Sequence, residues 1–182
     1  MKIQQLSIAY LETQDRVLVR IATDAEGEIR LWLTFRMTGR LLPGLRQTAA
    51  DIEASRTPLA TSDDHSKQML ADFRRAQSVQ DADFSTPFRQ DAKAFPLGAS
   101  PLLVTQVQVG RRKDGHVRLG FIEQQAEDSA TPRQFSLTLD SGLLHSVIHL
   151  LEAAVRKAQW PLPVPAAPDR TAPAASRPAL VN

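Results

Sequence analysis

The chain has 182 residues, a formal net charge of +2 and no cysteine. A chain of this length folds as one domain or as two small halves that share a core, and it buries enough surface to need no covalent staple. The lack of cysteine excludes disulfides, thiolate zinc sites and a cysteine nucleophile, and the small net charge is not the footprint of a general nucleic-acid binder.

The ends and the hydropathy of the chain predict a soluble protein. The first ten residues lack the basic segment and apolar stretch of a secretory leader. No run approaches the roughly 18 apolar residues that a helix needs to cross a bilayer. We therefore expect a cytoplasmic protein with no membrane partner.

Alternating apolar residues predict a hairpin at the start of the chain. Residues 3–12 and 16–22 each place apolar side chains at every second position. Pairing Tyr10 with Val17, and onward to Leu6 with Ile21, puts both apolar sets on one face.

A third strand is predicted at residues 29–33, after a loop of residues 25–27. Such a three-residue loop needs a left-handed third residue, which Gly27 can supply. This register places Arg20 opposite Trp32 on the face turned away from the core.

Two helices are predicted next. The first is capped by Thr38 or Gly39 and ends near Ala54, which puts Pro43 in the first turn, where its missing N–H costs nothing. The second covers residues 63–80. Its apolar residues form a narrow stripe that predicts surface packing: Met69, Leu70, Phe73, Ala76 and Val79.

An ordered loop should follow, because a flexible linker seldom contains three phenylalanines. Residues 83–101 hold Phe84, Phe88 and Phe95 among prolines and a glycine. We expect these rings to pack against the core.

The second half repeats the first. Strands are predicted at residues 105–109, 117–121 and 135–139, with a glycine-ended loop Lys113-Asp114-Gly115 between the first two. Ser141 should cap a last helix over 142–159. The apolar residues of this helix form its predicted core face: Leu144, Val147, Ile148, Leu151, Ala154 and Val155. The polar residues form its predicted solvated face: His145, His149, Glu152 and Arg156.

These elements predict an α+β fold made of duplicated βββα units, with antiparallel sheet packed against helices on one face. Residues 30–42 and 134–144 carry the repeat most clearly, since each runs from an alternating strand through a glycine turn to a Leu-Leu pair. The predicted segments are a first unit at 1–58, an inserted helix and loop at 59–101, a second unit at 102–160 and a disordered Pro-rich tail at 161–182.

Local motifs for catalysis or metal binding are weak. His145 and His149 have the spacing of a metal-binding helix face, but Ser146 stands where a zinc-protease motif needs glutamate. The acidic pairs near residues 63 and 81 fall at predicted helix ends, where acids serve as caps. We therefore expect a non-enzymatic protein without a cofactor.

The outer face of the predicted sheet is the candidate binding surface. Arginine beside an exposed tryptophan, flanked by amides, can stack bases and hold the phosphates of a single strand. Tryptophan and arginine are equally typical of protein interfaces. The candidate residues are Arg20, Arg30, Trp32, Gln106, Gln108 and Arg118, with Arg111, Arg112 and Lys113 at the rim.

Two resemblances accompany this pattern. A duplicated antiparallel sheet backed by helices resembles the PC4, Whirly and Pur-type single-strand binders in topology, although their units have four strands and no motif is shared. The phrases Arg-Leu-Trp-Leu-Thr, Phe-Pro-Leu-Gly with Pro-Leu-Leu, and Leu-Leu-His ending in Ala-Gln-Trp resemble a set of small uncharacterised proteobacterial proteins over residues 10–160. That resemblance implies no activity.

The expected function is therefore a binding or adaptor module that acts through a protein partner or as a homo-oligomer, with the Pro-rich tail as a second contact or a mere solvated end. The first alternative is single-stranded nucleic-acid binding on the outer sheet face. The second is an enzyme whose site no local motif reveals.

Overall fold

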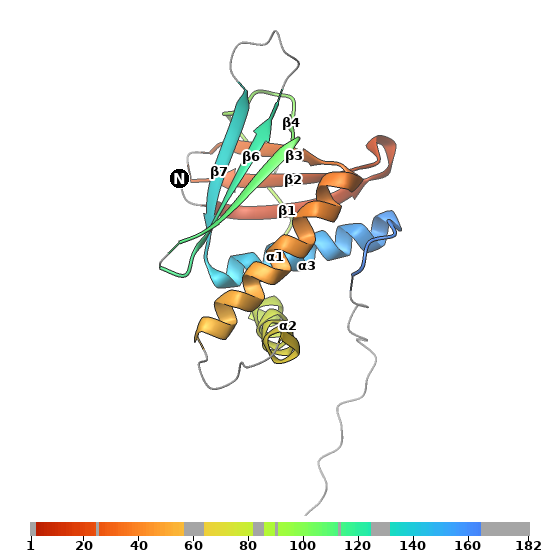
Figure 1. The fold of residues 1–182 in the computed structure, drawn as a ribbon. Helices are drawn as coiled ribbons and strands as arrows, with labels where there is room; N and C mark the ends of the chain where they lie inside the picture. The colour runs from red at the N-terminus through yellow and green to blue at the C-terminus, as the bar shows by residue number, and fades with distance from the viewer. Residues whose placement is uncertain are drawn as a thin grey trace, which may run out of the picture.

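A computed structural model describes residues 3–24, 26–56, 64–81, 86–89, 91–112, 114–124 and 132–164. Phe84, Lys113 and the Pro-rich tail from residue 165 lie outside the described residues. No helix in these ranges is long and apolar enough to span a bilayer. The elements are β1 (Ile3–Leu11), β2 (Arg16–Thr23), β3 (Glu28–Leu33), α1 (Phe35–Arg56), α2 (Asp64–Asp81), β4 (Leu102–Leu103), β5 (Gln106–Arg111), β6 (Val117–Glu123), β7 (Arg133–Leu139) and α3 (Ser141–Ala158) (Figure 1).

The α+β class is confirmed, with one four-stranded and one three-stranded sheet. Each half runs through three antiparallel strands into a helix, β1-β2-β3 into α1 and β5-β6-β7 into α3. The short strand β4 adds to the first sheet in parallel with β3. The order of the strands therefore repeats, with α2 inserted between the halves.

The first hairpin has the predicted register, since Tyr10 pairs with Val17 and Leu6 with Ile21. The second register is two residues from the prediction, so Arg20 lies opposite Arg30 and not opposite Trp32. Among the described residues of the turn, Glu26 is left-handed, with φ 53°.

Gly27 does not supply the left-handed residue that was predicted, and neighbouring parts of the chain approach it closely instead. Its carbonyl accepts the Thr23 N–H at 2.9 Å, and it forms a parallel bridge with Ala94. A Cβ at Gly27 would lie 3.2 Å from the Thr23 hydroxyl. Glycine is therefore needed there for close approach, and not for a left-handed turn.

The β5–β6 hairpin is as predicted. The Arg112 N–H donates to the His116 carbonyl at 2.9 Å, and Gly115 takes the left-handed conformation with φ 81°. Only glycine adopts that conformation without steric cost.

Two predicted helix starts are wrong. α1 begins at Phe35, because the Thr34 hydroxyl accepts the Met37 N–H at 3.2 Å and caps the helix there. Pro43 consequently lies inside the helix, where it costs one backbone hydrogen bond. α3 is capped by Asp140, whose carboxylate accepts the Leu143 N–H at 2.8 Å, and Ser141 is its first residue.

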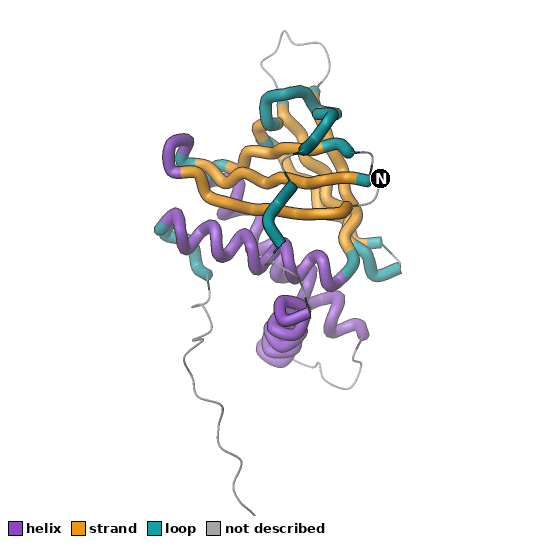
Figure 2. Tube along the Cα trace, turned by 180° about the vertical axis from the view of Figure 1, so that it is seen from behind, coloured by secondary structure: helices purple, strands orange, loops and turns teal. Residues whose placement is uncertain are grey.

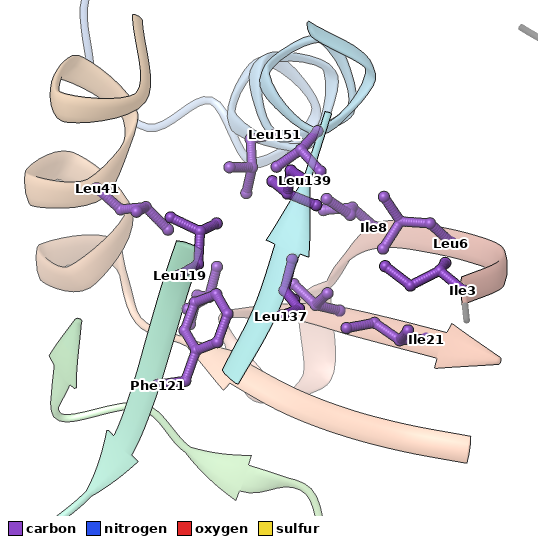
Figure 3. A pocket seen from close by; sticks show the side chains of 13 residues that line it. Ile3, Leu6, Ile8, Ile21, Leu41, Leu119, Phe121, Leu137, Leu139 and Leu151 are labelled. Atoms are coloured by element: carbon purple, nitrogen blue, oxygen red, sulfur yellow. The ribbon is translucent and has the colours of Figure 1, made fainter. Parts of the chain in front are cut away.

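The two sheets and helices α1 and α3 share one apolar core (Figures 1 and 2). Side chains from both inner sheet faces meet there with Leu41 of α1 and Leu151 of α3 (Figure 3). They leave a cavity of about 30 Å³ with an entirely apolar lining. A space this small and apolar stays dry and leaves no room for a ligand.

We expect Leu119→Ala to lower the free energy of unfolding by about 2–5 kcal/mol, because it removes a buried side chain from this shared core and enlarges the cavity. Leu119 is 1% exposed. Met69→Ala is the control, since Met69 is 61% exposed on α2 and should change stability by less than about 0.5 kcal/mol. Urea denaturation of both variants measures the difference, and equal losses would contradict the shared core.

Candidate functional site

Strand β5 is an open edge of the second sheet. It pairs with β6 on one side, and its burial pattern is exposed at every position except Val107, which is half-buried. Val109 is 42% exposed, and β5 is the only described strand with a large exposed hydrophobic residue. Such an edge presents unpaired backbone groups to solvent.

The phase of the β5–β6 hydrogen bonds decides which groups are free. Because Arg112 bonds to His116, the pairs Gly110–Arg118 and Gln108–Gly120 are hydrogen-bonded pairs by alternation along the ladder. The N–H and C=O groups of Val107 and Val109 therefore point away from β6.

Edge strands of soluble proteins are usually protected by charge, proline or a bulge. The segment Gln106–Gly110 contains none of these, since its register with β6 is continuous and its first charge is Arg111. The other edges of the two sheets differ: α3 packs along β1 (Figure 2), β4 is only two residues long, and β7 begins with the charged Arg133 and has no large exposed hydrophobic residue. Among the described strands, β5 therefore combines an open edge with an apolar side chain.

A groove of about 220 Å³ runs between β5 and α1. Apolar and polar side chains both line it. The lining residues are Met37, Arg40, Leu41 and Gly44 of α1 with Thr105, Gln106, Val107 and Val109. A strand added to β5 would thus set alternate side chains into this groove.

The outer face of the second sheet is a polar trough of about 510 Å³. It is hollow because Gly120, which has no side chain, pairs with Gln108 on one side and Ser136 on the other. Arg118 also lines it and donates to the Ser136 hydroxyl at 3.4 Å. Gln108 and Arg118 therefore share this face as predicted, while Gln106 is exposed at the end of β5 beside the groove.

The predicted residues of the first sheet lie elsewhere, beneath the loop that follows α2. Arg20 makes a bidentate ion pair with Glu28 at 2.7 and 3.0 Å, and its guanidinium lies 4.2 Å from the ring centre of Phe88. Arg30 stacks on Phe95 at 4.1 Å. The prediction that these rings pack against the core is wrong, because both lie on the opposite face of the first sheet, stacked on the two guanidinium groups, and Phe95 is 38% exposed.

Trp32 is half-buried on the same side of the sheet. It pairs with Leu18 of β2 and, in parallel, with Leu103 of β4, and its carbonyl accepts the Val104 N–H at 3.0 Å. These contacts place the indole in the middle of the four-stranded sheet, away from the second-sheet trough.

The basic hairpin residues are held near the end of α1. Arg111 pairs with the inward-facing Val117, and its guanidinium donates to the Ser55 hydroxyl at 2.6 Å. Arg112 pairs with Asp114 at 3.1 Å. Lys113 lies outside the described residues. The eight predicted residues that the structure describes are therefore distributed over three places, which are the second sheet, the first sheet and the β5–β6 hairpin.

The sequence reasoning missed a buried polar cluster where the three helices meet. Glu53 of α1 and His145 of α3 are 3% and 2% exposed. Glu53 accepts the Ser141 hydroxyl at 2.5 Å and lies 3.4 Å from Arg56 and 3.8 Å from Arg74 of α2. The carboxylate that accepts this hydroxyl is therefore also ion-paired with arginines from two helices.

A second buried carboxylate completes the helix contacts. Glu152 of α3 accepts from Arg46 of α1 at 2.7 and 2.9 Å and from Arg75 of α2 at 2.8 Å. The prediction of a solvated face on α3 is therefore wrong for His145 and Glu152, because α1 and α2 cover that face. The apolar pattern of α3 alone could not reveal this, since the covering groups come from distant arginines.

The same ion pairs explain the orientation of α2. Arg75 faces inward, with its side chain 15% exposed, whereas Met69 and Phe73 are 61% and 65% exposed. The predicted apolar stripe of α2 thus faces solvent in the described part of the helix. Ion pairs therefore fix the position of α2 more than the burial of apolar area does.

Burial lowers the pKa of His145 below that of a free histidine, and the nearby Glu53 carboxylate only partly offsets the effect. Its Nε2 lies 3.6 Å from Glu53 Oε1 and has no hydrogen-bond partner within the described structure. The described residues contain no group of three or more His, Asp or Glu side chains placed to hold a metal ion.

Protein-family profiles, curated proteins and solved structures provide no match to this chain. The chemistry of the surface is therefore argued from its own residues.

Because the pKa of His145 is lowered in the folded state, the unfolded chain binds more protons in mildly acidic solution. The stability that neutral His145 contributes is full above about pH 6.5, the unfolded value, and is lost as the pH falls through the lowered folded value. We expect His145→Gln to flatten the dependence of the urea midpoint on pH between about pH 7 and 5. The exposed His65 supplies the control His65→Gln, and an unchanged slope in His145→Gln would contradict this assignment.

Proposed function

We propose that this protein is a non-enzymatic binding module that engages a protein chain by strand addition at β5. The observation that carries the proposal is an unprotected edge strand, with a partly exposed valine, beside the groove of α1. Strand addition supplies affinity through backbone hydrogen bonds and specificity through pockets for alternate side chains.

The free groups on β5 define what such a partner must offer. It must be extended, because Val107 and Val109 present their N–H and C=O groups at the spacing of a strand. Its inward side chains should be apolar, because Met37, Leu41 and Val107 line the groove. The single cation of the groove, Arg40, favours a neutral or acidic residue at one end.

Single-stranded nucleic acid remains the second candidate, since the trough on the outer face is polar and open. Fewer observations support this candidate than support strand addition. Arg118 is the only cationic side chain that lines the trough among the described residues, and the guanidinium faces of Arg20 and Arg30 are stacked on Phe88 and Phe95. Binding of a phosphate backbone normally uses several cations.

Val109→Pro tests strand addition directly. Proline removes an N–H that points away from β6, so the β5–β6 ladder keeps its hydrogen bonds while the edge loses a donor. We expect a protein that co-purifies with the wild type from its own cytoplasm, after nuclease treatment, to be reduced at least tenfold, corresponding to about 1.4 kcal/mol or more.

Ser136→Pro is the matched control, because by the same alternation its N–H points away from β6 on the opposite edge of the sheet. It should retain the partner. Retention by Val109→Pro, with a melting temperature close to wild type, would exclude the edge as the binding site.

Salt dependence separates the two candidates. We expect the protein complex to persist from about 50 to 200 mM salt, whereas binding to a single-stranded oligonucleotide that uses several phosphate contacts would fall by orders of magnitude. Fluorescence anisotropy with a labelled oligonucleotide measures this, with Arg118→Ala in the trough and Arg36→Ala on exposed α1 as a matched pair. Tight, steeply salt-dependent binding lost only in Arg118→Ala would favour nucleic acid.

A further inference from the structure

The centre of β5 has the same sequence in both directions. Val107-Gln108-Val109 reads identically from either end. Antiparallel pairing of two identical strands about a twofold axis at Gln108 therefore places Val107 of each copy opposite Val109 of the other, and Gln108 opposite itself.

The hydrogen-bond phase fits this axis. The outward N–H and C=O groups belong to Val107 and Val109, while those of Gln108 are used by β6. Each Val107 can therefore exchange both backbone hydrogen bonds with Val109 of the second copy. A shift by one residue would point the groups that bond to β6 at each other, so the phase of the backbone permits the axis that the sequence symmetry suggests.

The side chains are compatible on both faces. The valines lie on the groove side with Met37 and Leu41, where cross-strand pairs of β-branched residues are favourable. The two Gln108 amides meet on the outer face, where they can bond to each other. Arg111 would lie opposite Thr105 of the second copy, so no like charges oppose one another.

Helix α1 leaves the edge accessible to a second copy. It runs beside β5, with Gly44 next to the segment Thr105–Val109 and Ser55 bonded to Arg111. An added Cβ at Gly44 would meet no atom within 4 Å, so the helix is open at this position.

We propose that a second copy of this chain occupies the β5 edge, and that two protomers pair through β5 into one continuous antiparallel sheet. This rests on the proposed function, because it assigns the occupant of the same edge. The dimer closes the edge by symmetry, so it does not grow into a fibre. It also joins the two outer troughs into one polar surface.

Cysteine cross-linking tests the axis in the full-length protein, which has no native cysteine. Residues across a non-hydrogen-bonded antiparallel pair lie about 4.5 Å apart at Cα, within the disulfide range of about 4.4–6.8 Å. We expect Gln108→Cys to form a disulfide dimer under mild oxidation at low concentration. Ser136→Cys, on the outer face of β7, should stay monomeric under the same conditions. No cross-link in Gln108→Cys would overturn the proposal.

Sedimentation equilibrium provides an independent measurement. We expect a dimer for the wild type and a dissociation constant at least tenfold higher for Val109→Pro. A monomeric wild type would overturn the proposal, and so would a dimer unaffected by Val109→Pro, which would point to another surface such as the Met69–Phe73 face of α2.

The two proposals fail separately. A monomeric protein whose protein partner is still lost in Val109→Pro would refute self-pairing and leave strand addition in place. A β5-linked dimer whose partner is retained by Val109→Pro would support self-pairing and remove the edge as the site of a different protein.

Discussion

Burial of both inner sheet faces in one core is the constraint from which the rest of this structure follows. Neither three-stranded meander can bury its apolar face alone, so the two sheets face each other and α1 and α3 close the space between them. This arrangement buries the apolar faces of both sheets and of helices α1 and α3. α3 closes the edge at β1, and β5 is left open beside α1.

The arginines are largely committed within the fold. Arg46 and Arg75 hold the buried Glu152, and Arg20 and Arg30 hold the loop aromatics. Arg133 ion-pairs with Glu123 and donates to the Leu97 carbonyl at 2.9 Å, which fastens that loop to the second sheet. An arginine-rich composition therefore does not translate into a basic surface.

Under the proposed function, recognition depends chiefly on backbone groups. An open strand recognises another chain through hydrogen bonds that any extended segment can make, and it depends on neighbouring side chains for selectivity. At β5 these are the valines, Met37 and Leu41 within the groove and Gln108 on the outer face. Unpaired backbone groups make an edge strand prone to nonspecific association. Pairing with a second copy about a twofold axis would satisfy these groups and leave no edge open.

The sequence by itself determined the elements whose signals are local. Period-two alternation gave the strands and the register of Tyr10 with Val17, and Gly115 gave the turn of the second hairpin, since side-chain direction and glycine conformation depend on neighbouring residues alone. Only the tertiary structure decided that α1 and α2 bury His145 and Glu152, that Arg20 and Arg30 lie under aromatic rings, and that β5 stays open. These outcomes depend on contacts between residues tens of positions apart, which no local period encodes.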